Sequence, residues 1–328
     1  MRKLRNPSVI LLIIAILLAG FSVYHTNFAR NLDGPDISFE EEEVTASVNV
    51  SDEELLKGVK AEDKQDGDVT DSLVVEGLST FMDDNTRLAT YAAFDADGNV
   101  AKSTRKVKYK DYVGPQFSLS EPLSFPVGTS KDLQSNLSAF DQIDGDISGS
   151  ILMYPDTNLD TSIPGNYKVR FEVANSAGDV EELNMSIKIY ETDNAEPIRV
   201  DLTDYVAYVN LGQNAESSEN AEGEDAQKKK TAKNTIKNSE DLVRFIDAVS
   251  FNGRKVEVIG TGNESEAAAA AASSAKRNSS NIIRAGDIDI DDSEVDYSKP
   301  GVYTVTYSYT SDGITGKGQL TLIVRGEA

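Results

Sequence analysis

The sequence predicts an all-β protein made of tandem β-sandwich modules that follow a single transmembrane helix. Three observations support this fold class. A block of aspartates repeats along the chain, alternating strand-like segments end in turn-forming residues, and the first thirty residues contain a long apolar segment. Repetition at a fixed period is typical of modular arrays, and the alternating pattern is typical of half-buried strands.

The N-terminal segment, residues 1–30, is predicted to be a basic cytoplasmic tip followed by a transmembrane signal-anchor. Arg2, Lys3 and Arg5 come first, and an uncharged segment then runs from Asn6 to Tyr24. This length is just sufficient for a helix that crosses a bilayer, and basic flanks stay in the cytoplasm. The rest of the chain is therefore expected outside the cell. A cleaved signal peptide, which would release a secreted protein, is the alternative.

The internal repeat divides the remaining chain into modules. The first block, Asp63-Lys-Gln-Asp66-Gly-Asp68, returns as Asp141-Gln-Ile-Asp144-Gly-Asp146. A second block, which begins at Asp160 and contains Pro-Gly, returns at Asp296 after a much longer spacing. Low-complexity insertions near 214–240 and 261–281 explain the longer spacing. We therefore predict module 1 at 34–110, module 2 at 111–191 and module 3 at 196–328.

Strand-like segments fill each module. Their residues alternate or are β-branched and aromatic, at 88–94, 101–109, 167–173, 183–190, 302–309 and 319–324. Asp, Asn and Gly separate the two members of each pair, which is hairpin turn chemistry. Each module is thus predicted to close with a β-hairpin and to form a sandwich. Placed end to end, three such modules would extend about 100 Å.

The order of these motifs resembles the bacterial immunoglobulin-like domain of insecticidal crystal proteins and Gram-positive surface proteins. Module 2 matches nearly throughout, whereas module 1 has Asp84-Asn85 in place of Pro-Gly, and module 3 lacks the Asp-Gly-Asp motif. The resemblance implies tandem immunoglobulin-like sandwiches used as stalks, spacers or binding modules on a cell surface. It implies no shared catalytic activity.

The composition excludes several classes of chemistry. The chain has no cysteine, and its only histidine is His25, so thiol catalysis and histidine metal sites are not expected in the modules. Asp and Glu outnumber Lys and Arg by 55 to 32, and all of the acidic residues follow the first thirty positions. Such an acidic surface repels nucleic acid, which we do not expect as a partner. We predict that the protein is not an enzyme.

The repeated aspartates are the main candidates for a metal site, because Asp95-x-Asp97-Gly98 lacks the third acidic ligand and the later glutamate of an EF-hand loop and is expected to form a plain turn. They could supply calcium with oxygen ligands at one end of a sandwich. They could instead accept backbone N–H groups and fix a turn, which we favour, so no cofactor is assigned. The candidates are Asp63, Asp66, Asp68, Asp141, Asp144 and Asp146.

The predicted function is that of a membrane-anchored bacterial cell-surface protein, acting as a structural stalk, an adhesin or an interaction scaffold. Its expected partners are the membrane, through the N-terminal helix, and a cell-wall polymer or another surface protein. The alternative is an extracellular protein that binds cell-wall polysaccharide or a secreted partner, with or without calcium. A third reading places the activity in a complex rather than in this chain. The insertions of module 3 are the first candidates for a partner site.

Overall fold

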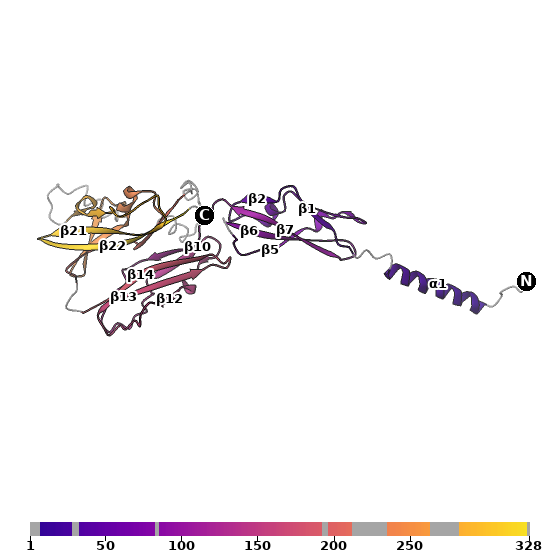
Figure 1. The fold of residues 1–328 in the computed structure, drawn as a ribbon, viewed down its shortest axis with the longest axis horizontal. Coiled ribbons are helices and arrows are strands. Elements are labelled where there is room, and N and C mark those ends of the chain that lie inside the picture. Colours follow the sequence, from indigo (N-terminus) through magenta and orange to yellow (C-terminus); the bar gives the residue numbers. More distant parts are fainter. Residues whose placement is uncertain are drawn as a thin grey trace, which may run out of the picture. The chain divides into compact units, whose positions relative to one another are not determined.

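The structure is a computed structural model that describes residues 7–27, 33–82, 85–191, 196–211, 235–262 and 282–326. Outside the N-terminal helix, the described residues fold mainly into strands, which confirms the all-β prediction. The chain divides into two compact units, Met1–Lys110 and Asp111–Ala328. The first unit holds module 1, and the second unit holds modules 2 and 3. The ribbon of each unit is drawn in Figure 1.

Helix α1 spans Pro7–Asn27. Proline suits the first helical position because its missing N–H would have no partner there. The described side chains of α1, from Ile10 to Tyr24, are exposed. No helix within the described ranges is both long enough and apolar enough to cross a membrane. The transmembrane part of the prediction is therefore not confirmed, and the basic residues before Pro7 lie outside the described residues.

Module 1 is a sandwich of two sheets, ordered β1-β3-β4 and β2-β7-β6-β5. The buried side chains of Ala61, Ala89, Tyr91 and Val107 lie in its core. Its strands are β1 (Asp36–Phe39), β2 (Glu43–Ala46), β3 (Val59–Asp63), β4 (Gly67–Asp68), β5 (Val74–Leu78), β6 (Thr86–Phe94) and β7 (Val100–Tyr109), with helix α2 at Asp52–Leu55.

Module 2 repeats this topology, with sheets ordered β11-β10-β8 and β12-β13-β14-β9. Its strands are β8 (Gln116–Leu119), β9 (Ser124–Pro126), β10 (Leu137–Asp141), β11 (Gly145–Asp146), β12 (Leu152–Pro155), β13 (Gly165–Ala174) and β14 (Val180–Tyr190). In β13, Val169, Phe171 and Val173 are buried while the residues between them are more exposed. The alternation that predicted this strand therefore places every second side chain in the core.

Module 3 forms one larger sheet ordered β19-β18-β17-β15-β22-β21-β20, with β16 also paired to β22. Its elements are β15 (Ile198–Leu202), β16 (Val206–Asn210), η5 (Ser239–Phe245), β17 (Ile246–Phe251), β18 (Arg254–Ile259), β19 (Ile283–Arg284), β20 (Asp289–Asp291), β21 (Gly301–Ser311) and β22 (Ile314–Arg325). Glycines let β22 approach β15, since a Cβ at Gly316 would lie 2.5 Å from the Ile198 carbonyl carbon. Most of the predicted insertions lie outside the described residues.

Modules 2 and 3 pack side by side rather than end to end. Their buried apolar residues form one continuous cluster, and β13 and β14 lie beside β21 and β22 in Figure 1. The extended arrangement expected from the repeat is therefore wrong for these two modules. The repeat revealed the units, but it carried no information about the surfaces that join them.

Module 3 covers the edge of strand β8. The outward N–H of Leu119 donates to Asp204 Oδ1 at 2.9 Å, and the Tyr205 N–H donates to the Leu119 carbonyl at 2.9 Å. The Phe117 N–H donates to the Tyr208 hydroxyl at 2.7 Å. An edge strand offers unpaired backbone groups, and these contacts satisfy them. Side chains of module 3 and one backbone hydrogen bond thus cover the edge of β8.

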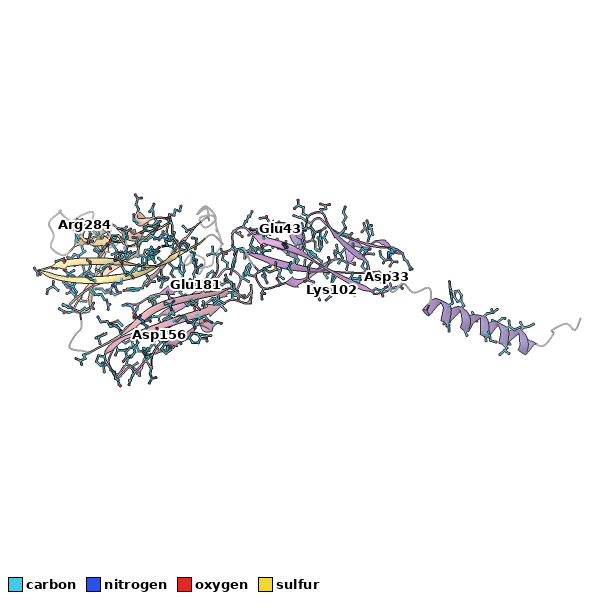
Figure 2. The ribbon with its side chains drawn as sticks, viewed as in Figure 1. Asp33, Glu43, Lys102, Asp156, Glu181 and Arg284 are labelled. Atoms are coloured by element: carbon cyan, nitrogen blue, oxygen red, sulfur yellow. The ribbon has the colours of Figure 1, made fainter. Side chains whose placement is uncertain are left out.

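Arg325, at the end of β22, links three parts of the second unit. Its guanidinium lies 3.0 Å from Glu181 Oε1 of β14, and Glu181 is labelled in Figure 2. It also donates to the carbonyls of Gly114 and Pro115 and lies 4.4 Å from the centre of the Tyr208 ring. The Arg325 side chain of module 3 thereby contacts both the residues that precede β8 and strand β14 of module 2.

Candidate functional site

The first aspartate motif closes a tight turn between β3 and β4. Asp63 Oδ1 accepts hydrogen bonds from the N–H groups of Gln65 at 2.7 Å and Asp66 at 3.0 Å. Asp68 Oδ1 accepts from the Thr70 N–H at 2.9 Å. Side-chain and backbone hydrogen bonds from Thr70 lower the pKa of Asp68. The carboxylates therefore hold backbone donors that the turn leaves without partners.

The second copy of the motif has the same geometry. Asp141 Oδ1 accepts from the N–H groups of Ile143 at 2.8 Å and Asp144 at 3.1 Å. Asp146 Oδ1 accepts from the Ser148 N–H at 3.0 Å. The two copies of the sequence motif thus form the same set of turn hydrogen bonds.

The middle aspartate of each motif reaches a different loop. Asp66 Oδ2 accepts from the Ala96 N–H at 2.9 Å, and Asp144 Oδ1 accepts from the Ser176 hydroxyl at 2.7 Å. Ala96 and Ser176 lie in the turns of the closing hairpins, well beyond the motifs in the chain. Each motif therefore ties its own turn to the hairpin of the same sandwich.

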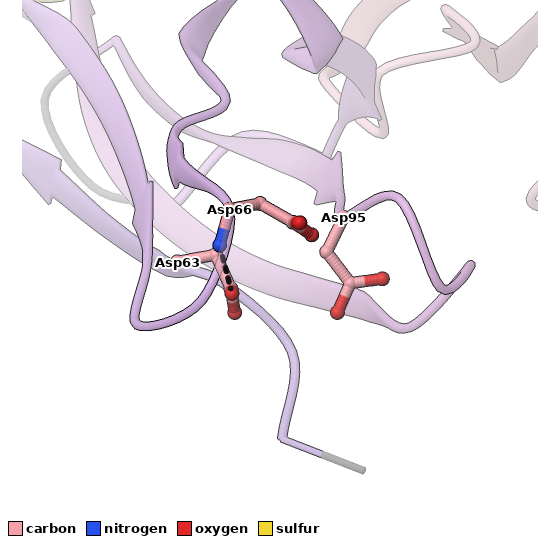
Figure 3. Close-up of side chains that lie close together, drawn as sticks. All are labelled: Asp63, Asp66 and Asp95. Atoms are coloured by element: carbon pink, nitrogen blue, oxygen red, sulfur yellow. Dashed lines mark hydrogen bonds between the residues drawn. The ribbon is translucent and has the colours of Figure 1, made fainter. Parts of the chain in front are cut away.

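This contact brings a third carboxylate to the turn in module 1. One oxygen from each of Asp63, Asp66 and Asp95 lies within 4.8 Å of the others. Figure 3 shows the three side chains close together. Sequence reasoning missed the role of Asp95, although Asp95 and Asn175 occupy equivalent places at the starts of the two hairpin turns. Extending the alignment of the repeat past its first block would have found it. Asp68 lies outside this group.

Asp95 is held in its ionised form. It is only 4% exposed, and burial raises its pKa, but hydrogen bonds from the Asn99 side chain and backbone outweigh burial and lower it. Asn99 donates through its N–H at 2.8 Å and through Nδ2 at 2.7 Å. The nearby Asp63 charge acts in the opposite direction. Module 1 therefore concentrates negative charge at one end of its sandwich.

Module 2 replaces this carboxylate with an amide. Asn175 Nδ2 donates to Asp141 Oδ2 at 3.1 Å and to the Tyr112 hydroxyl at 2.7 Å. The hydroxyl in turn donates to Asp179 Oδ2 at 2.9 Å, and burial raises the pKa of Tyr112. Neutral donors thus satisfy Asp141 directly. Within the described residues, only Asp63, Asp66 and Asp95 form a group with the spacing of metal ligands.

Chemically, the module 1 group offers three carboxylates to a cation. Calcium takes six to eight oxygen ligands, so backbone carbonyls or water would have to supply the remainder. The same carboxylates already accept hydrogen bonds from the turn. These hydrogen bonds are those expected of a structural closure of the turn, and calcium binding stays the untested alternative.

No protein-family model matches this sequence, and no curated protein does. Among solved structures, it is similar to the CBM51-2 and INT domains of Clostridium perfringens ZmpB in complex with GlcNAc, with 16% identity and a TM-score of 0.19. That match covers 47% of this chain and 41% of the other, so this chain spans less than half of that structure.

Two structures of cadherin and protocadherin extracellular domains are similar over a longer stretch. The Protocadherin GammaB4 extracellular domain has 11% identity and a TM-score of 0.18, covering 90% of this chain and 50% of that chain. Drosophila N-cadherin EC1-4 has 12% identity and a TM-score of 0.20, covering 91% of this chain and 76% of that chain. At these values, the fold assignment depends on the strand order of this chain itself. Its strand order gives a two-sheet sandwich in module 1, the same in module 2, and one larger sheet in module 3.

Proposed function

We propose that this chain is a bacterial cell-surface protein whose sandwich modules form an interaction scaffold. The observation that carries the proposal is the duplicated sandwich, in which the aspartate motifs close turns and tie them to the hairpins. A catalytic role has no such support, because the only histidine is His25 and the carboxylates are used in turns. We therefore assign the chain a binding or structural role, not an enzymatic one.

We also propose that the modules belong to the bacterial immunoglobulin-like family, and the geometry of the second motif supports this assignment. Asp160 Oδ1 accepts from the Ser162 N–H at 2.9 Å, and Asp296 Oδ1 accepts from the Ser298 N–H at 3.0 Å. The motif tyrosine then folds back onto this turn: the Tyr167 hydroxyl donates to the Ile163 carbonyl at 2.9 Å. The motif residues thus form one structural device, which explains why they occur together.

Attachment to the cell membrane through residues 1–30 is also proposed. Its support is the basic cluster Arg2, Lys3 and Arg5 ahead of the uncharged segment. Fractionation of cells that express the full chain tests it. We expect the protein in the membrane pellet after an alkaline wash. A soluble protein that begins beyond the apolar segment would show cleavage and secretion instead.

A second candidate function is binding of cell-wall polysaccharide, and one exposed surface of module 2 favours it. Tyr154 is 41% exposed, and the Arg170 guanidinium lies 4.6 Å from the centre of its ring. Arg170 also contacts Glu172 and Glu182 at 2.6 Å. Aromatic, basic and acidic groups side by side are suited to the hydroxyl groups and apolar faces of sugars.

Co-sedimentation of residues 33–326 with purified bacterial cell walls, with calcium and with chelator, separates the two functions. Saturable binding that Tyr154→Ala weakens would favour the polysaccharide. The matched control is Tyr190→Ala, a partly exposed tyrosine at the end of β14. An absence of binding in every condition would favour the scaffold, whose partner is then a protein.

A further inference from the structure

Among the described residues, no strand pairs with the outward edge of strand β1 in module 1. Glu40 N–H donates to the Gly58 carbonyl, so Asp36, Ser38 and Glu40 direct their backbone groups toward β3. In an antiparallel pair, the backbone N–H and C=O groups of the intervening residues point away from the partner strand. The N–H groups of Ile37 and Phe39 therefore face outward, and no described residue bonds them.

The equivalent edge in module 2 is fully covered. Gly34-Pro35 before β1 corresponds to Gly114-Pro115 before β8, at the same place in the repeat. Ile37 and Phe39 thus correspond to Phe117 and Leu119. Module 3 lays residues 204–208 and Arg325 along that edge, which satisfies both N–H groups and the carbonyls of Gly114 and Pro115.

The side chains at the two edges also differ in burial, and those of module 2 are more buried than those of module 1. Phe117 and Leu119 are 0% exposed, whereas Ile37 and Phe39 remain half-buried. Both pairs occupy the same positions in the same kind of sheet. Module 1 thus retains an apolar edge of the type that an extended segment buries in module 2.

The negative charge around β1 favours a basic binding partner. Acidic residues lie in and beside the strand: Asp33, Asp36, Glu40, Glu41, Glu42 and Glu43. Lys64 and Lys60 approach Asp33 and Glu40 only at 3.9 Å and in exposed positions, which offsets little of this charge. A second copy of this edge would bring like charges together, whereas a basic segment would be attracted. Arg325 provides the precedent, since its guanidinium caps the carbonyls at the start of β8.

We propose that the outward edge of β1 is a docking site for an extended segment of a partner protein that carries arginine. The segment adds a strand beside β1, and its arginine lies at the carbonyls of Gly34 and Pro35. Main-chain hydrogen bonds supply affinity in this kind of strand addition, and flanking side chains supply selectivity. This inference rests on the proposed scaffold role and specifies where that scaffold binds.

Two labelled peptides test the site on the full chain in detergent. Both carry the sequence of residues 203–210, Thr-Asp-Tyr-Val-Ala-Tyr-Val-Asn, followed by Arg-Arg in one and Glu-Glu in the other. The added residues follow the position of Asn210, which pairs with Arg325 in module 3. We expect saturable binding of the arginine peptide and at least about tenfold weaker binding of the glutamate peptide.

Ile37→Pro removes the outward backbone N–H of residue 37, which would donate to the docked segment. Its control is Ile37→Val, which keeps this N–H. Proline is tolerated there because the Ile37 N–H makes no bond to β3. Binding should weaken about tenfold or more in Ile37→Pro and stay unchanged in Ile37→Val. Asp36→Lys, at an exposed position, should reduce the preference for arginine without blocking the edge.

Hydrogen exchange provides a readout that does not depend on a variant. The arginine peptide should slow exchange of the Ile37 and Phe39 amides in the unmodified protein. Unchanged exchange, or equal peptide binding to Ile37→Pro and Ile37→Val, would overturn the proposal. Self-association through β1 that excludes the peptide would make a second copy the occupant and would overturn it as well. These outcomes leave the cell-surface role untouched, because fractionation and wall binding test that role separately.

Discussion

The guanidinium of Arg325 lies 3.0 Å from the carboxylate of Glu181, and this ion pair joins modules 2 and 3 of the second unit. Both side chains are largely buried, with exposed fractions of 17% and 18%. Burial raises the pKa of Glu181 even though Arg325 acts to lower it. The pair is therefore a structural constraint at the join between modules 2 and 3.

Removing this arginine should destabilise the second unit. Arg325→Ala leaves the Glu181 charge buried without its partner and frees the carbonyls of Gly114 and Pro115, so we expect a loss of about 3 kcal/mol in the free energy of unfolding. Urea denaturation measures it. The control is Arg170→Ala, whose more exposed pairs should cost about 1 kcal/mol or less. Equal losses in both variants would contradict the role of Arg325.

Close approach of β22 to β15 should make Gly318 intolerant of a side chain. A Cβ at Gly318 would overlap the carbonyl oxygen of Val200, so Gly318→Ala should cost about 1 to 3 kcal/mol in the stability of the second unit. Gly149→Ala is the matched control, because no atom lies within 4 Å of its Cβ position. Comparable melting temperatures for the two variants would show that β22 sits further from β15.

The carboxylate group of module 1 is expected to act as a turn closure. Asp66→Asn and Asp68→Asn should therefore lower the melting temperature equally with calcium and with chelator. Asp95→Asn introduces the amide that module 2 has at Asn175, and it should be tolerated in both conditions. A stabilisation of the unmodified protein by calcium that Asp66→Asn and Asp95→Asn lose would establish a metal site instead.

Acid should weaken the turns in which aspartate binds a serine or threonine. Hydrogen bonds from Ser162 and Ser298 lower the pKa values of Asp160 and Asp296 below the ordinary 3.8. The ionised forms are therefore favoured by folding, so their stabilisation is complete above pH 3.8 and is lost as pH falls through the lower folded-state values. Denaturation of Asp160→Asn at neutral pH and at a pH well below 3.8 should show a smaller acid effect than in the unmodified protein. An identical acid effect would contradict it.

The second unit should behave as one cooperative body. Residues 111–191 alone would expose the β8 edge and the apolar residues that module 3 covers. We expect this fragment to unfold at lower temperature than residues 111–326 or to self-associate. Calorimetry and light scattering measure both effects. A fragment as stable and monomeric as the whole unit would show that modules 2 and 3 fold independently.

The sequence predicted the strands and turns better than it predicted the surfaces through which the modules contact one another. The strand predicted at 101–109 is β7 (Val100–Tyr109), because alternation and a following turn are local properties. The contact of Phe117 with Tyr208 was not predictable in this way, since the two residues lie in different modules. The aspartates of the repeat were found, but the approach of Asp95 to Asp63 and Asp66 was not, because only the fold brings the hairpin turn beside the motif. The exposed edge of β1 likewise becomes visible only beside its covered equivalent.

We propose above all that the modules stand outside the cell while the N-terminus stays inside. Because the chain has no cysteine, single cysteines can be labelled without background. Ser186→Cys places a thiol at an exposed position of β14, and Asn6→Cys places one before the apolar segment. On intact cells, a membrane-impermeant maleimide should label Ser186→Cys at once and Asn6→Cys only after permeabilisation. Labelling of Ser186→Cys only after permeabilisation would contradict the account.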